Sequence, residues 1–232
     1  MSFASFLEPL IKPLIDEMTP GWATLSKRWG LGSVPLSDGL TLWTSWTGLT
    51  WLAFATSLLF VEVGERNELS LVEGVLGGAL VGLAQWFVLR PHLPTAARWI
   101  VATVLSWGAL TLFHIGALGW MAPGTSNLFF RSLLGIAYGA YVGTGLGVAQ
   151  WFAIRRQIPG AWRWISLSAG VWAVGIAFGW LVGGILRSAS HLFVSEVFGL
   201  MVAWGAIAAL SGVGIVSLLY QERRQEHGSP VE

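Results

Sequence analysis

The chain carries few ionisable side chains inside its apolar stretches, and these are its first candidates for chemistry. Glu73, His114 and Glu196 each stand near one end of such a stretch. Ionisable groups inside a membrane commonly mark a ligand or ion site. Glutamates so close to an interface also pair with arginines at matching depth, here Arg131 and Arg187. Ion pairing is the favoured interpretation for them, and ligand binding is the alternative.

His114 is the deepest of these groups, about 9 Å from Trp120 by helical rise. An imidazole there either packs as a neutral hydrogen-bonded group or acts as an axial ligand to a tetrapyrrole or in proton handling. Packing is the favoured interpretation. If a ligand is held, His114 and Trp107, about two turns away, are the expected walls of its pocket. The sequence names no cofactor; a pigment or a bound lipid would suit this apolar site. No metal site is expected, because no second ligand lies at a suitable spacing.

Two glutamines recur in equivalent strings. Gln85 and Gln150 each precede an arginine by five residues, Arg90 and Arg155 respectively. Helical rise therefore places each amide about 7–8 Å inside a membrane boundary. An amide there requires a partner, because an unsatisfied polar group in lipid costs several kcal/mol. Interhelical hydrogen bonding is favoured, and contact with a ligand is the alternative.

Glycines recur at four-residue spacing in two of the stretches. Four residues are slightly more than one helical turn, so each series forms a smooth face along which two backbones can approach closely. We expect these glycines to pack helices; the alternative is that they line a solute path. They are Gly74, Gly78 and Gly82, and Gly135, Gly139, Gly143 and Gly147.

No catalytic pattern is present, so we expect the protein not to be an enzyme. The nearest approach to an intramembrane serine protease of the rhomboid kind is Ala209-Leu-Ser-Gly212, which lacks the first glycine and has no later intramembrane histidine. The chain has no cysteine, and therefore no thiolate nucleophile. Its net charge of +1 gives no electrostatic footprint for nucleic acid.

The elements that position these residues are membrane spans. Of the 232 residues, 54% are hydrophobic and only 11% are charged, so lipid must cover much of the surface. We expect an all-α integral membrane bundle of six transmembrane helices in residues 40–220. A broken amphipathic, interfacial segment at 1–39 precedes it, and a polar tail at 221–232 follows. The expected spans are 40–62, 70–90, 98–121, 131–154, 163–186 and 195–220.

A long motif occurs twice, 65 residues apart, as Gly78–Arg90 and Gly143–Arg155, each followed by Arg-Trp-Ile. A third, degraded copy retains Gly212-Val213. The odd-numbered spans share a pair of tryptophans eight residues apart: Trp43/Trp51, Trp99/Trp107 and Trp164/Trp172. We therefore expect three tandem, parallel two-helix repeats. They can be arranged about a pseudo-threefold axis along the membrane normal or in a linear array.

Lysine and arginine placement predicts the orientation. Cytoplasmic loops carry the excess of these residues. Ten would lie on one side and three on the other, which puts both termini in the cytoplasm. The ten are Lys12, Lys27, Arg28, Arg90, Arg98, Arg155, Arg156, Arg163, Arg223 and Arg224, and the three are Arg66, Arg131 and Arg187.

The repeated strings Ala84–Arg90 and Ala149–Arg155, each followed by Ala-x-Arg-Trp-Ile, resemble a group of functionally uncharacterised polytopic membrane proteins. The group is common in cyanobacteria and related bacteria and shares A-Q-W-x-x-L-R helices. The resemblance covers roughly residues 40–220. It implies the fold family and a bacterial inner or thylakoid-type membrane, and it carries over no catalytic residue.

Two functions remain after these exclusions. The favoured one is a non-catalytic membrane scaffold or accessory subunit that packs against a larger membrane complex and holds lipid or pigment. Glycine faces, many tryptophans and few buried charges favour it. The alternative is a small-molecule transporter or channel, although a carrier of charged solutes would need more charges along its path.

Overall fold

In a computed structural model of the chain, the described residues are 36–65, 69–113 and 116–227, and side chains at 36–37, 116–117 and 221–227 are left aside. Most of the expected N-terminal segment, together with Arg66 and His114, lies outside them. The described part is all-α, as predicted, with one short 3-10 helix and no strand. Its helices are α2 (Leu36–Ser57), α3 (Leu71–Leu89), α4 (Ala97–Leu112), η1 (Gly116–Gly119), α5 (Leu128–Ile154), α6 (Arg163–Ser190) and α7 (Val194–His227).

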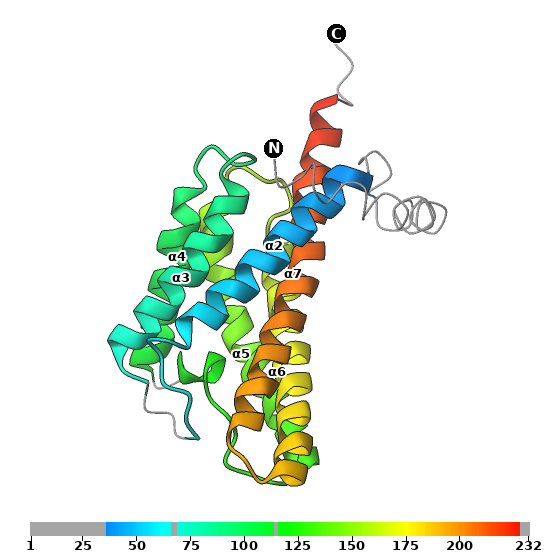
Figure 1. Cartoon of the computed structure of the whole chain (residues 1–232). Helices are drawn as coiled ribbons and strands as arrows, with labels where there is room; N and C mark the ends of the chain where they lie inside the picture. The colour runs from blue at the N-terminus through cyan, green and yellow to red at the C-terminus, as the bar shows by residue number, and fades with distance from the viewer. Residues whose placement is uncertain (1–35, 66–68, 114–115, 228–232) are drawn as a thin grey trace, which may run out of the picture.

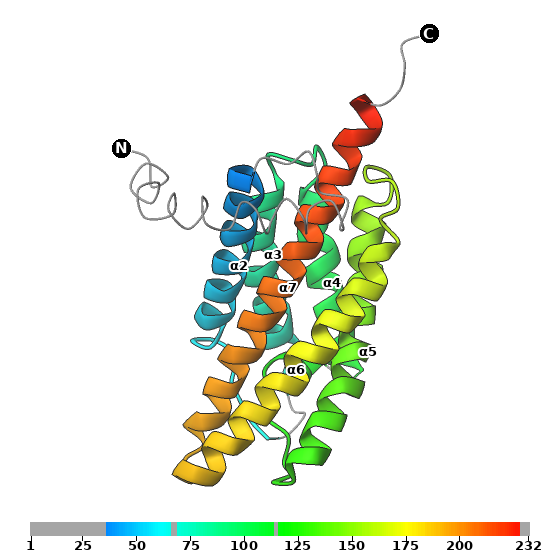
Figure 2. The same cartoon turned by 90° about the vertical axis from the view of Figure 1, so that its right-hand side faces the viewer.

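The six α-helices of the described part form a closed ring. Each packs against its neighbours in the chain, and α2 also packs against α7. The loops joining α3 to α4 and α5 to α6 lie at the same end as the start of α2 and the end of α7 (Figure 1 and Figure 2). This arginine-rich end carries Arg90, Arg98, Arg155, Arg156 and Arg163.

Side-chain caps and turn residues set the helix ends. Ser70 begins α3 through a capping box, in which its hydroxyl accepts from the Glu73 amide and the Glu73 carboxylate accepts from the Ser70 amide. Asn127 begins α5 by accepting from the amides of Phe129 and Phe130. α6 ends at Ser190 and is capped by His191, which adopts a left-handed conformation with φ of 58°.

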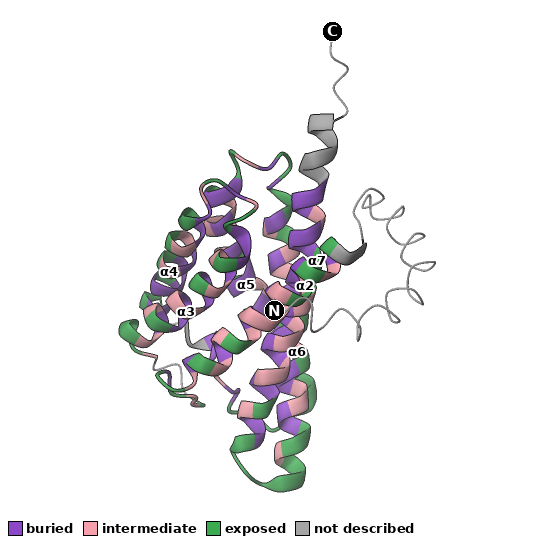
Figure 3. Ribbon diagram, turned by 45° about the horizontal axis from the view of Figure 1, so that its top comes forward, coloured by how far each residue is buried: buried purple, intermediate pink, exposed green. Residues whose placement is uncertain are grey.

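Four of the described helices, α3, α5, α6 and α7, are long and apolar enough to cross a membrane. Exposed residues lie on the outside of the ring and buried ones face its interior (Figure 3). Many of the exposed side chains are large and apolar, including Phe87, Leu105, Phe152 and Phe178. An apolar exterior of this kind is what lipid covers in a membrane protein.

The expected continuous span at 98–121 differs from the structure. α4 ends at Leu112, and after η1 the chain turns inward. Trp120 is buried and donates from Nε1 to the Ser57 hydroxyl at 2.8 Å. The Gly119 carbonyl accepts from Trp204 Nε1 at 2.8 Å. These contacts hold the apolar segment across the end of the ring opposite the arginines, where a continued helix could not reach them.

Candidate functional site

Three tryptophans from alternate helices meet inside the ring. Trp46 on α2, Trp99 on α4 and Trp164 on α6 lie with ring centroids 5.9, 5.5 and 6.5 Å apart, and we call them the first tryptophan layer. All three are buried. Edge and tilted contacts at such distances stabilise aromatic pairs beyond simple burial.

Each indole of the first tryptophan layer donates to the neighbouring helix. Trp99 Nε1 donates to Gln85 Oε1 at 2.9 Å, and Trp164 Nε1 donates to Gln150 Oε1 at 2.8 Å. Trp46 Nε1 donates to the Ser211 hydroxyl at 2.9 Å. Both glutamines therefore make interhelical hydrogen bonds through their amide oxygens.

A second aromatic layer lies nearer the end of the ring that is opposite the arginine-rich end. Trp107, Trp172 and Trp204 contact one another at centroid distances of 5.6, 5.1 and 6.3 Å, and Phe54 stacks on Trp204 at 4.7 Å. Trp120 also packs on Trp107, at 4.7 Å. The Trp107 ring, expected as a pocket wall, packs against other aromatic rings and also lines the small cavity described next.

Between the two layers is a small cavity of about 30 Å³, which we call the axial cavity. Every residue that lines it is buried. Its wall includes one polar side chain from each of the six helices: Thr50, Gln85, Thr103, Gln150, Ser168 and Ser211. Such a volume is far below the several hundred Å³ of a pocket for a drug-sized ligand, so neither a pigment nor a lipid fits there.

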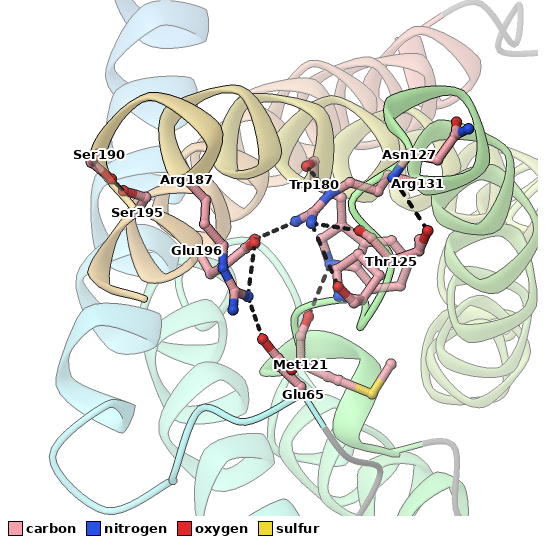
Figure 4. A network of polar contacts seen from close by, with 11 residues as sticks. Glu65, Met121, Thr125, Asn127, Arg131, Trp180, Arg187, Ser190, Ser195 and Glu196 are labelled. Atoms are coloured by element: carbon pink, nitrogen blue, oxygen red, sulfur yellow. Dashed lines mark hydrogen bonds and ion pairs between the residues drawn. The ribbon is translucent and has the colours of Figure 1, made fainter. Parts of the chain in front are cut away.

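Four charged residues form a network at the end of the ring opposite the arginine-rich end. We call this network the Arg131 charge cluster, and it comprises Arg131, Glu196, Arg187 and Glu65 (Figure 4). Arg131 Nη2 donates to Glu196 Oε2, and the two side chains are only 2% and 1% exposed. Arg187 contacts the other Glu196 oxygen at 3.4 Å and pairs with Glu65. The network links α5, α6 and α7 with the segment after α2.

Arg131 also donates from its other two side-chain nitrogens. Its Nε donates to the Trp180 carbonyl at 2.9 Å, and Nη1 donates to the carbonyls of Thr125 at 3.0 Å and Pro123 at 3.5 Å. A buried ion pair whose other hydrogen-bonding sites are filled is a structural clamp, because removing either partner strands a buried charge. The ion pairing expected for Glu196 is present, but it is buried inside the protein instead of snorkelling at an interface.

Glu73, grouped with these residues from the sequence, lies elsewhere. Its carboxylate accepts from the Ser70 amide at 2.9 Å and from the Glu62 amide at 3.3 Å. Its role in the described part is to cap α3 and tie it to the preceding loop. His114, the remaining candidate, falls outside the described residues.

The glycine faces bring two pairs of helices together. A Cβ added at Gly78 would lie 2.7 Å from Trp107 on α4, and one at Gly82 would lie 3.3 Å from Thr103. On α5, Gly143 and Gly147 approach the α6 backbone in the same way, as do Gly135 and Gly139. Gly74 faces Thr111 on α4.

The tryptophan pair expected on the first span is shifted in register. Trp46 belongs to the first tryptophan layer and Phe54 to the second aromatic layer. Trp43 and Trp51 instead donate from Nε1 to backbone carbonyls of α7. Both pairs are eight residues apart, and sequence matching favours the all-tryptophan pair. The cavity-lining hydroxyls were missed too, because single threonines and serines are ordinary in apolar helices. Their spacing offered a signal, since Thr103 and Ser168 are 65 residues apart, as are the glutamines.

No protein-family model, curated protein or solved structure matches this chain.

Proposed function

We propose that the chain is an integral membrane protein with six spans, arranged as three two-helix repeats about a pseudo-threefold axis, with both termini in the cytoplasm. α2 and α4 supply the two spans beyond the four long apolar helices. Their 22 and 16 residues correspond to about 33 and 24 Å. Because α2 and α4 pack within the closed ring, they cross the bilayer together with the four long apolar helices.

The repeat proposal is supported by equivalent contacts. Gln85 with Trp99 and Gln150 with Trp164 make the same hydrogen bond 65 residues apart. The first tryptophan layer takes one ring from each of α2, α4 and α6. In the third unit, the Ser211 hydroxyl takes the acceptor role of the glutamines.

Reporter fusions test the topology. We expect fusions at Pro159 and Gln225 to report cytoplasm and one at Ser126 to report the outer side, because most arginines lie at the end shared by the first two sites. A fusion at Gln225 that reports the outer side contradicts the proposed orientation.

Within this architecture, we propose that the protein acts as a non-catalytic scaffold or accessory subunit that packs against other membrane components. The observation that carries the proposal is an interior filled by two aromatic layers. Its two glutamines already accept from tryptophan indoles, and Arg131 and Glu196 already pair with each other. The apolar exterior is the surface left for recognition, and it suits lipid, a pigment or another membrane protein.

The runner-up function, a channel for a small solute, is favoured by one observation. The axial cavity is polar and lies inside the ring, where a permeation path would run. Aromatic rings close it toward both ends of the ring, so the conformation described is a closed one.

Photo-crosslinking separates these functions. A photoreactive residue placed at Leu105, which is 66% exposed on α4, should capture a partner protein in the native membrane. The matched control is Leu110, on the same helix but 6% exposed, which should capture only the protein itself. The gently purified protein should also retain a partner, lipid or pigment by mass spectrometry and absorption spectroscopy. Purified protein that retains none of these and drives saturable solute uptake into liposomes would establish the transporter instead.

A further inference from the structure

The hydroxyl groups that face the axial cavity are not all satisfied by the protein. Thr50 is 1% exposed, and its Oγ1 has no hydrogen-bonding partner among the described residues. The hydroxyl of a helical threonine can usually reach the carbonyl one turn back, as the Thr111 hydroxyl does with the Trp107 carbonyl. A buried hydroxyl left unpaired is costly, and Thr50 lines a cavity in which a bound molecule can pair with it.

The other polar groups of the wall limit what that occupant can be. Gln150 uses its Oε1 to accept from Trp164 and its Nε2 to donate to the Thr103 hydroxyl at 3.1 Å. Thr103 Oγ1, having accepted that bond, still has a proton to donate. Thr50 can both donate and accept. The occupant must therefore be able to accept hydrogen bonds, and it must fit in a space of about 30 Å³.

The uncharged wall of the cavity excludes a small ion as the occupant. No acidic or basic side chain lines the axial cavity, so a cation or an anion would be buried there without a counter-charge. An apolar occupant would leave the Thr50 hydroxyl unpaired. Water meets both requirements, and a volume of about 30 Å³ accommodates about two water molecules.

We propose that the axial cavity is a water-binding site, in which two water molecules bridge Thr50 to the polar groups of the other helices. Thr50 on α2 and Thr103 on α4 both line this site and both have hydrogen-bonding capacity left, so the bound water links these two helices inside the ring. This assignment stands whether the protein is a scaffold or a channel, because it rests on the cavity wall alone.

The Thr50→Val substitution tests the proposal by the sign of its effect, because valine keeps the shape of threonine and removes the hydroxyl. If water pairs with Thr50, the variant loses a hydrogen bond and its melting temperature in detergent falls, by about 2–4 °C. If the cavity is dry, the variant loses only an unpaired buried hydroxyl and melts at or above the temperature of the parent, which overturns the proposal.

Thr47→Val is the matched control. The Thr47 hydroxyl is also buried without a partner and lies three residues earlier on the same helix, but Thr47 does not line the cavity. We expect this variant to melt no lower than the parent. An equal fall in both variants would show that the loss comes from α2 itself, and it would also overturn the proposal.

A structure at a resolution that shows ordered water provides the second measurement. We expect density about 2.5–3.0 Å from Thr50 Oγ1, the range of O–H···O hydrogen bonds. Crystals under xenon pressure should show no xenon in the cavity, because xenon enters dry apolar cavities. Xenon bound there, or an ion with short oxygen contacts in place of water, would refute the assignment.

Discussion

Replacement of Gly143 by alanine should separate α5 from α6. The added Cβ would lie 2.5 Å from the Ser168 carbonyl oxygen and 2.7 Å from Trp172 Cβ. Ordinary contact begins near 3.4 Å, so the helices must move apart by about 0.9 Å at this point. Because the nearest atom belongs to the backbone of α6, a rotamer change cannot relieve the clash.

The expected cost follows from overpacking, which typically destabilises a well-packed interior by about 1–3 kcal/mol. Alanine also has a higher helix propensity than glycine, by up to about 1 kcal/mol, and this gain must be removed from the comparison. Gly145→Ala provides the correction, because Gly145 lies on the same helix and its added Cβ would meet only Leu110 Cδ2, at 3.5 Å.

Thermal unfolding in mild detergent, followed by tryptophan fluorescence, measures the difference. For a chain of this size, about 1–3 kcal/mol corresponds to about 2–12 °C, so Gly143→Ala should melt lower than Gly145→Ala by that interval. Leucine at Gly143 should lower it further. If the two alanine variants melt together, the close approach of α5 and α6 is refuted.

Three further substitutions probe the polar contacts, each by the same unfolding measurement. Arg131→Leu strands the buried Glu196 carboxylate and should cost about 3–5 kcal/mol; an unchanged melting temperature would show that the pair does not clamp the helices. Gln150→Leu removes the acceptor of Trp164 Nε1 and should cost about 1–3 kcal/mol; a neutral effect would mean that water replaces the amide. Trp120→Phe removes the hydrogen bond to Ser57 and part of an indole, and it should cost at least about 1 kcal/mol; full stability would show that this segment does not close the ring.

Apolar segments between turn signals were enough to predict most helices. The expected spans at 70–90, 131–154 and 163–186 correspond to α3, α5 and α6 within a few residues. The early end of α4 was not predictable in this way. The residues after Leu112 are apolar enough to continue a span, and their inward turn depends on partners as distant in the chain as Ser57 and Trp204.

The candidate site was predictable only where a residue type demands a partner. Gln85 and Gln150 required hydrogen bonds at their depth, and they make them. The sequence does not show which groups bond to these amides, because hydrophobic periodicity marks the buried face of a helix and not the neighbour that the face contacts. For the same reason the eight-residue tryptophan spacing selected Trp43 and Trp51, although Trp46 and Phe54 are the pair that faces the interior.

The closure of the ring by α2 and α7 has a consequence for biosynthesis. All three indole N–H groups of α2 donate to α7: Trp43 to the Ala209 carbonyl, Trp46 to the Ser211 hydroxyl and Trp51 to the Met201 carbonyl. These acceptors lie 150–166 residues further along the chain. At about 5–20 residues per second of synthesis, α2 is made roughly 10–30 s before its acceptors. The nascent chain therefore passes through an open-ring intermediate, in which the three indole donors of α2 still lack their acceptors on α7.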